Sequence, residues 1–281
     1  MFAEAAPAQD IHLSSVLDVD FDQLSDTGLV RDHNEDSIGY LSPETPDSAR
    51  ERGWLFVLAD GVGGHDRGEV ASRMTVDSMV SDFRDAVAGD PLTSFLPRLI
   101  QKANLKVYEA AAETGPGGAS MATTVVACAL RFDRAVVAHV GDSRCYLIRG
   151  GRASLLTRDH TVPNEQLRMG LITTREASNA QTTNVLSRSL GPSMIVNVDV
   201  ADHQVYSGDV LLLCSDGLHN SVRERDIEET LRSHSSLGEA AKTLVEMAKR
   251  RDGKDNISIQ LIRVKGVERV GMYRGRHYKI R

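Results

Sequence analysis

LFVLADGVGGHDRGE, residues 55–69, joins two hydrophobic patterns of different period through a short polar link. Apolar residues run without a break up to Asp60, and three glycines (Gly61, Gly63 and Gly64) follow within four positions. From about residue 66 to residue 88 the apolar residues recur near helical spacing, so the stretch predicts a buried strand over 53–60 followed by a helix. Glycine beside a carboxylate leaves room for a backbone carbonyl or a bound water to approach a metal ion, which makes Asp60 the first candidate site residue.

The rest of the chain contains further runs typical of strands and of helices. Strands are predicted at 123–132, 135–140, 145–150, 209–215 and 256–264, and helices at 94–113, 224–233 and 236–250. The strands cluster instead of alternating regularly with helices, which favours an α+β fold with antiparallel sheets. Residues 161–190 are polar and contain no strand-like run, so we expect an insertion near the site.

Composition limits the class of protein. The 281 residues are 41% hydrophobic and 26% charged, which is typical of a globular domain, and the net charge of −6 argues against nucleic acid as a partner. No apolar run approaches the roughly 18 residues of a membrane span, and no signal-peptide pattern is present. The three cysteines (Cys128, Cys145 and Cys214) stand singly in apolar runs, as buried thiols do in a reducing compartment. We therefore expect a soluble, cytoplasmic protein that has no membrane partner.

Four aspartates stand at the ends of predicted strands. Asp60, Asp142 and Asp216 each follow an apolar run and have glycine as a neighbour, and Asp255 directly precedes the run NISIQLI. Any one of them could simply cap a turn, but four aspartates that all stand at strand ends suggest that their carboxylates converge on one place. Converging carboxylates repel one another unless cations neutralise them, and oxygen ligands favour Mg²⁺ or Mn²⁺.

A second polar segment, SDTGLVRDHNEDSIGY (25–40), places Arg31 shortly before Glu35 and Asp36. An arginine offers paired donors that match phosphate oxygens, so a cation beside acidic groups suits a site that holds both metal and phosphate. A surface salt bridge is an equally good interpretation of this segment alone.

Taken in order, a series of motifs resembles the metal-dependent protein serine/threonine phosphatases of the PP2C (PPM) family in their bacterial form. The motifs are RDHNEDS (31–37), ADGVGGHDRGE (59–69), ATTVVACAL (122–130), HVGDSRCYLIRGG (139–151), TRDHT (157–161), SRSLG (187–191), LLLCSDGL (211–218) and KDNISI (254–259). The resemblance implies a four-layer α-β-β-α sandwich with two central antiparallel sheets. It would place a phosphatase domain at 21–264, with a flap at about 161–190 that influences substrate choice. An acidic N-terminal arm (1–20) and a basic tail (265–281) would flank this domain.

The resemblance also implies a set of metal ligands. Asp60 corresponds to the aspartate that bridges two metal ions, and Gly61 to the glycine whose carbonyl binds the second. Asp216 and Asp255 correspond to the other ligands of the first ion. Asp142, together with Asp216, corresponds to the ligands of a weaker third ion.

Other positions correspond to groups around these ions. Glu35 and Asp36 match an acidic pair that holds metal-bound waters, and Arg31 matches the arginine that binds phosphate. Eukaryotic members carry a histidine, a proposed general acid, where this chain has Val62. His65 is a possible replacement, although packing or a hydrogen bond near the helix start is the more expected role and a metal-bound water is another candidate acid.

The resemblance implies hydrolysis of phosphoserine and phosphothreonine in proteins by a hydroxide that bridges two Mn²⁺ or Mg²⁺ ions. Phosphorylated proteins would be the substrates, and the enzyme would reverse a serine/threonine kinase. Two alternatives stay open, namely a hydrolase of small phosphoesters and a catalytically silent protein that binds phosphoproteins.

Overall fold

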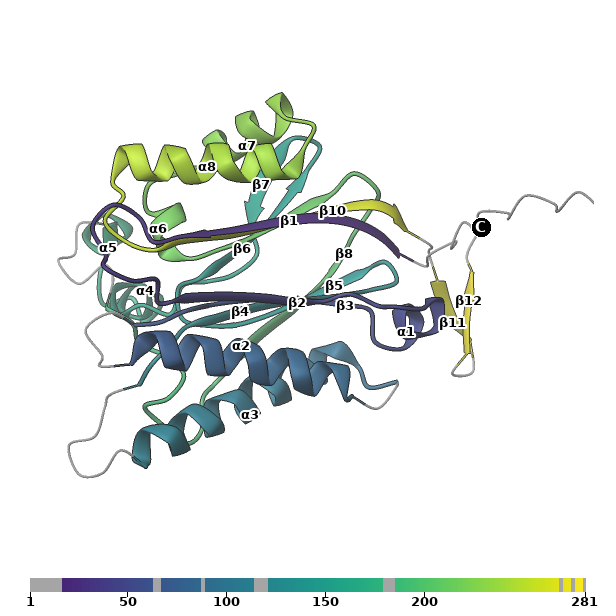
Figure 1. Ribbon diagram of the computed structural model, residues 1–281, viewed down its shortest axis with the longest axis horizontal. Coiled ribbons are helices and arrows are strands. Elements are labelled where there is room, and N and C mark those ends of the chain that lie inside the picture. Colours follow the sequence, from purple (N-terminus) through teal and green to yellow (C-terminus); the bar gives the residue numbers. More distant parts are fainter. Residues whose placement is uncertain are drawn as a thin grey trace, which may run out of the picture.

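The computed structural model describes residues 17–62, 67–86, 89–113, 121–178, 185–267, 270–273 and 276–279. Two five-stranded antiparallel sheets lie face to face, and helices cover their outer faces (Figure 1). The first sheet has the order β1 (Leu17–Asp26), β10 (Ile257–Val267), β9 (Val210–Cys214), β6 (Arg144–Arg149) and β7 (Arg152–Leu155). The second has the order β2 (Asp36–Leu41), β3 (Trp54–Asp60), β4 (Val125–Arg131), β5 (Arg134–Val140) and β8 (Asp199–Gln204). A separate hairpin, β11 (Val270–Tyr273) and β12 (Arg276–Lys279), follows β10.

Helices complete the outer layers of the sandwich. The second sheet packs against α2 (Gly68–Arg84) and α3 (Leu92–Ala112), and the first packs against α6 (Asp216–His219), α7 (Glu224–Ser233) and α8 (Leu237–Arg251). A short helix α1 (Pro46–Glu51) joins β2 to β3. The arrangement confirms the predicted α-β-β-α layers.

Strand β3 shows why the central strands read as unbroken apolar runs. Leu55 and Val57 pack against the helices α2 and α3, whereas Phe56 and Leu58 pack against the other sheet. Successive side chains of a strand point to opposite faces, so a strand that is covered on both faces must be apolar at every position. Burial on both faces therefore fixes β3 at the centre of the fold.

The boundaries expected for the domain need correction. β1 begins at Leu17 and pairs with β10 through Leu17 and Val267, so the last residues assigned to the N-terminal arm and the first residues assigned to the tail lie in strands. The sequence did not predict β1, because its acidic residues alternate with Leu17, Val19 and Phe21. The side chains of these three apolar residues pack into the layer between the sheets. Residues 1–16 lie outside the described residues.

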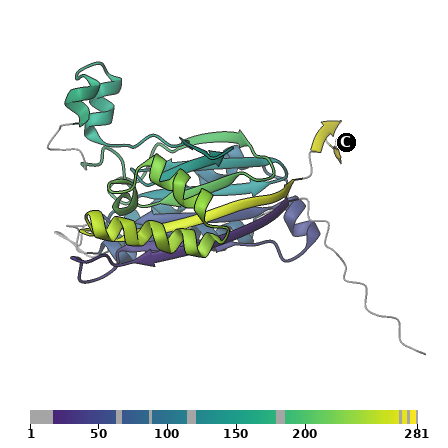
Figure 2. The same cartoon turned by 90° about the horizontal axis from the view of Figure 1, so that it is seen from above.

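The segment predicted as an insertion contains two short helices, α4 (Val162–Arg168) and α5 (Thr174–Ser178). Seen from above, these two helices stand away from the sandwich (Figure 2). No named strand lies in the described part of 161–190, although single bridges pair Thr161 with Leu186 and Thr123 with Leu190. We call residues 161–190 the flap. None of the helices in the described ranges is both long and apolar enough to cross a membrane.

Candidate metal and phosphate site

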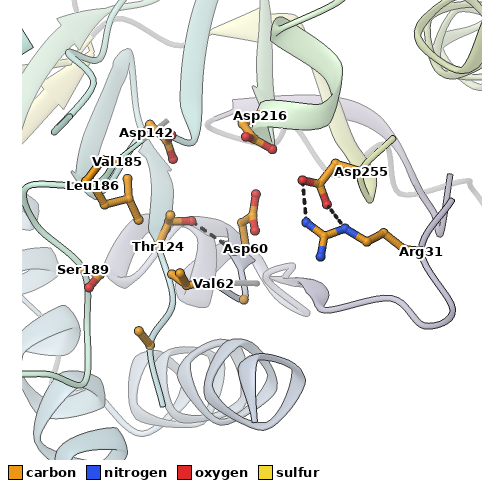
Figure 3. Close-up of a pocket in the computed structure, with 12 residues that line it drawn as sticks. Arg31, Asp60, Val62, Thr124, Asp142, Val185, Leu186, Ser189, Asp216 and Asp255 are labelled. Carbon is orange, nitrogen blue, oxygen red and sulfur yellow. Dashed lines mark hydrogen bonds and ion pairs between the residues drawn. The ribbon is translucent and has the colours of Figure 1, made fainter. Parts of the chain in front are cut away.

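A cavity of about 510 Å³ opens at one end of the sandwich, where β3, β5 and β9 end and β10 begins (Figure 3). All four predicted aspartates reach it. Its wall consists of Arg31, Asp60, Gly61, Val62, Ala122, Thr124, Asp142, Val185, Leu186, Ser189, Asp216 and Asp255. Among the described residues, the cavity wall therefore contains one arginine and four carboxylates, and residues of the flap form part of it.

The carboxylates around the cavity are held in an environment that opposes their ionisation. Burial, together with repulsion from neighbouring aspartates, raises the pKa of Asp142 to about 7 and that of Asp216 to about 6. Burial also raises the pKa of Asp60 well above its ordinary value, and repulsion from Asp36 and Asp216 adds to this effect. Buried carboxylates whose charges repel one another are stabilised in the ionised form by a cation that they share.

Asp36 gives the clearest sign that a cation belongs here. It begins β2 and lies directly opposite Asp60 in the antiparallel pair with β3. Both of its carboxylate oxygens are buried, and neither has a hydrogen-bond partner among the described residues. Burial raises its pKa to about 7, although the nearby hydroxyls of Ser215 and Ser258 act to lower it. Buried polar atoms are nearly always satisfied, so two bare oxygens beside three further carboxylates fit bound cations or their waters.

Arg31 and Asp255 form a close ion pair at the edge of the cavity. The Nε and NH2 groups of Arg31 lie 2.9 Å from the two carboxylate oxygens of Asp255, and each side chain is 38% exposed. The hydrogen bond to Asp255 is the largest cause of the raised pKa of Arg31. The salt bridge that the sequence left open is thus present, but it lies within the site and joins the predicted phosphate ligand to a predicted metal ligand.

Gly61 allows three segments of backbone to meet. A Cβ atom at this position would lie 2.5 Å from the carbonyl group of Gly68 and 2.7 Å from the carbonyl oxygen of Glu35. The Gly61 N–H donates to that Glu35 carbonyl at 3.1 Å. The sequence suggested glycine for close approach of a metal, and the structure adds that glycine is needed for the start of α2 to reach the end of β3.

Comparison with known proteins identifies the family. The sequence model of the family described as protein phosphatase 2C matches residues 33–255. The chain belongs to the protein phosphatase 2C family. This confirms the family and the activity class that the order of the motifs predicted.

Relatives of the phosphatase align with most of this chain. The serine/threonine phosphatase stp of Listeria innocua is 36% identical over 256 residues, which are 90% of this chain and 96% of that protein. The solved S. agalactiae serine/threonine phosphatase has a TM-score of 0.78 at 33% identity and covers 88% of this chain and 100% of its own. The catalytic domain of the phosphatase PstP, solved in complex with two manganese ions, has a TM-score of 0.74 at 32% identity, with coverage of 88% and 99%.

Further residues lie beside the cavity and around the end of β3. Glu35 is buried beside the cavity, with one carboxylate oxygen 4.0 Å from Arg31. Thr124 lines the cavity and accepts the Asp60 N–H at 3.1 Å, and Thr123 donates to the Asp60 carbonyl at 2.8 Å. These threonines hold the end of β3 in place through hydrogen bonds to its backbone. The predicted role of His65 stays a prediction, because His65 lies outside the described residues.

Asn256 is a residue that sequence reasoning missed. Its side-chain oxygen accepts the Glu35 N–H at 2.8 Å, and its side-chain nitrogen donates to the carbonyls of Thr27 and His33 at 3.0 and 3.1 Å. Asn256 directly follows Asp255, so its hydrogen bonds attach the loop that contains Arg31 to the segment that contains Asp255. The only signal in the sequence was its place in the KDN triplet, which does not reveal contacts made over 200 positions away.

Proposed function

We propose that this phosphatase hydrolyses phosphoserine and phosphothreonine in proteins and that it uses two Mn²⁺ or Mg²⁺ ions held around Asp60. The observation that supports the proposal most strongly is the set of buried carboxylates that share one cavity with a single arginine. Such an arrangement is costly without divalent cations and well suited to binding them. The relatives named as serine/threonine phosphatases supply the substrate class.

In this proposal Asp60, Asp216 and Asp255 provide carboxylate ligands and Gly61 a carbonyl ligand. Asp36 and Glu35 accept hydrogen bonds from metal-bound waters, and Asp142 contributes to a weaker third position. Divalent cations bound here would lower the pKa of a water molecule, so that it would lose a proton and be available as hydroxide to attack phosphorus, and they would neutralise charge on the phosphate.

Arg31 is the phosphate ligand in this proposal. Its side chain is 38% exposed and lines the cavity, where a phosphate group can reach it. A cation bound to Asp255 would compete with Arg31 for the Asp255 carboxylate. The guanidinium would then be free to stabilise negative charge that develops on the phosphoryl oxygens.

We further propose that the enzyme acts in the cytoplasm and reverses a serine/threonine kinase. The kinase part rests on the substrate class, because phosphoserine and phosphothreonine in proteins must be made by such a kinase. The cytoplasmic part rests on the three cysteines, which are buried free thiols as in a reducing compartment. A general hydrolase of small phosphoesters and a silent phosphoprotein-binding protein are the competing functions.

The test is hydrolysis of a phosphothreonine peptide by the wild type with Mn²⁺, by the wild type with EDTA, and by Asp216→Asn with Mn²⁺. We expect turnover that needs the metal and falls by at least about a hundredfold in the variant. Asp77→Asn, which changes an exposed aspartate on α2, is the matched control and should retain wild-type turnover. Metal binding without turnover would favour the silent protein, and turnover of p-nitrophenyl phosphate alone would favour the small-phosphoester hydrolase.

A further inference from the structure

Arg188 connects the flap to the sandwich behind the wall of the cavity. Its NH2 group lies 2.9 Å from Glu165 on α4, and its NH1 group lies 2.8 Å from Asp199 at the start of β8. Arg188 is itself next to Ser189 and two residues from Leu186, which both line the cavity. One side chain thus joins a flap helix, a sheet strand and the segment that forms part of the cavity wall.

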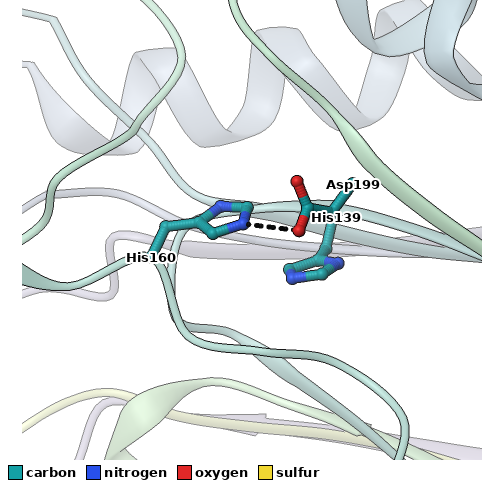
Figure 4. Close-up of side chains that lie close together, drawn as sticks. All are labelled: His139, His160 and Asp199. Carbon is teal, nitrogen blue, oxygen red and sulfur yellow. Dashed lines mark ion pairs between the residues drawn. The ribbon is translucent and has the colours of Figure 1, made fainter. Parts of the chain in front are cut away.

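The surroundings of Arg188 first suggest a second metal site. His139, His160 and Asp199 bring their possible ligand atoms within 4.8 Å of one another (Figure 4). The two imidazole rings are stacked, with centroids 4.7 Å apart. A cation bound there would need free nitrogen lone pairs and an uncompensated carboxylate.

Neither condition is met. The His160 Nδ1 atom accepts the Gly141 N–H at 3.1 Å, which places the ring hydrogen on Nε2, and this nitrogen faces Asp199 at 3.3 Å. The His139 Nε2 atom is engaged with the backbone of Arg158.

The charge on Asp199 is also already balanced. Burial acts to raise the pKa of Asp199, but hydrogen bonds from His160 and Arg188 outweigh it and hold the pKa below its ordinary value. Asp199 in addition pairs with Arg158 at 3.0 Å. The cluster therefore works as a hydrogen-bonded anchor for arginine instead of a cation site.

We propose that Arg188 is a positioning residue that holds the flap segment 185–190 against the cavity and so sets the affinity for phosphorylated protein substrates. This inference rests on the proposed function, because it concerns how the same cavity receives its substrate. Arg188 itself does not line the cavity, so its effect passes through the neighbouring residues.

Backbone hydrogen bonds attach the two ends of the segment to different parts of the molecule. Val162 donates to the Val185 carbonyl at 2.8 Å, and Ser187 donates to the His160 carbonyl at 2.9 Å. These two bonds join the first half of the segment to the base of α4, which stands away from the sandwich (Figure 2). At the other end, Leu190 and Thr123 exchange backbone hydrogen bonds of 3.2 and 2.8 Å, which tie the segment to the sandwich. Arg188 adds charge-assisted bonds to Glu165 and to Asp199 from two different nitrogen atoms, whereas a lysine would have to reach both carboxylates from a single nitrogen.

The consequence for catalysis depends on the size of the substrate. A phosphopeptide extends beyond the phosphate and contacts the wall that contains Val185, which is 48% exposed, and Leu186. p-Nitrophenyl phosphate is too small to depend strongly on that wall. A displaced segment should therefore weaken binding of the peptide more than binding of the small substrate.

The first measurement is amide hydrogen exchange of the full Mn²⁺-loaded chain. Arg188→Gln should speed exchange at the Val162 and Ser187 amides by about tenfold, since two charge-assisted bonds are lost. Arg168→Gln is the matched control, because Arg168 also pairs with Glu165, at 2.8 Å, but is 53% exposed and does not contact Asp199. The control should exchange within about twofold of the wild type.

The second measurement compares kcat and KM for a phosphothreonine peptide and for p-nitrophenyl phosphate. In Arg188→Gln the peptide kcat/KM should fall about tenfold further than that of the small substrate, mostly through KM. Arg188→Lys should recover only part of this loss.

Several results would overturn the inference. They are unchanged exchange in Arg188→Gln, equal losses on both substrates, or a bound-metal count that falls by one in Asp199→Asn. If the wild type does not act on the peptide at all, the proposed function fails, and the exchange experiment still decides whether Arg188 anchors the flap.

Discussion

Replacing Asp36 by asparagine should stabilise the metal-free phosphatase at alkaline pH. The carboxylate of Asp36 is buried, and its pKa is raised to about 7. For an acid whose pKa is higher in the folded state, the folded protein binds the extra proton. Stability of the metal-free wild type should therefore fall as the pH rises from about 4 to about 7.

The magnitude follows from the difference between the two pKa values. A rise from about 3.9 in the unfolded chain to about 7 in the fold corresponds to about 4 kcal/mol at pH 8 and to about 1.5 kcal/mol at pH 5. Asparagine avoids this cost but brings an amide that lacks full hydrogen bonding, at a cost of about 2 kcal/mol. The net gain should be about 2 kcal/mol at pH 8, or about 4–8 °C in Tm, and should vanish at pH 5.

Thermal unfolding in EDTA at pH 5 and pH 8 measures this difference, with Asp77→Asn as the exposed control. Adding Mn²⁺ should raise the Tm of the wild type, because a ligand that binds only the folded state stabilises it, and should raise the Tm of Asp36→Asn less. A gain of equal size at both pH values, or a loss of stability at pH 8, would show that ionisation of Asp36 is not what limits the metal-free protein.

Two further predictions concern the same cluster. Binding of Mn²⁺ should release protons and become tighter between pH 6 and pH 8, because carboxylates with pKa values of about 6 to 7 must ionise before they bind the ion. Calorimetry in buffers of different ionisation enthalpy measures the protons released. No proton release at pH 6 would contradict this prediction. Gly61→Ala should cost about 2–3 kcal/mol in urea unfolding, since its Cβ would meet the Gly68 carbonyl at 2.5 Å, whereas Gly266→Ala, with its nearest atom at 3.6 Å, should cost under about 1 kcal/mol.

The core strands could be predicted from the sequence because their environment is uniform. β3, β4 and β9 are covered on both faces, so their apolar runs are unbroken and short enough to exclude helices. The strands β1 and β8 were missed because they lie at sheet edges and contain charged residues interspersed among apolar ones. A strand of that kind is recognised only when its partner is known.

The site was predictable to the extent that each residue carried its own local signal. Asp60 and Asp216 stand beside glycine at the end of an apolar run, and such a pattern is visible within eight residues. Asn256 and Arg188 act through partners far away in the sequence, and no local pattern distinguishes them from other polar residues in loops. The family resemblance supplied the roles of the first group but said nothing of the second.

Contacts of the backbone hold the members of the carboxylate cluster close together. Without cations, repulsion among Asp36, Asp60 and Asp216 acts to separate the strand ends that carry them. Thr124 holds the Asp60 N–H at 3.1 Å, and close backbone packing at Gly61 leaves no room for the end of β3 to move. The fold thus keeps these carboxylates together through contacts that do not involve their charges. In the proposed function a cation would bind to ligands that are already in place, and the packing of the sheets, instead of the metal, would supply the free energy that brings them together.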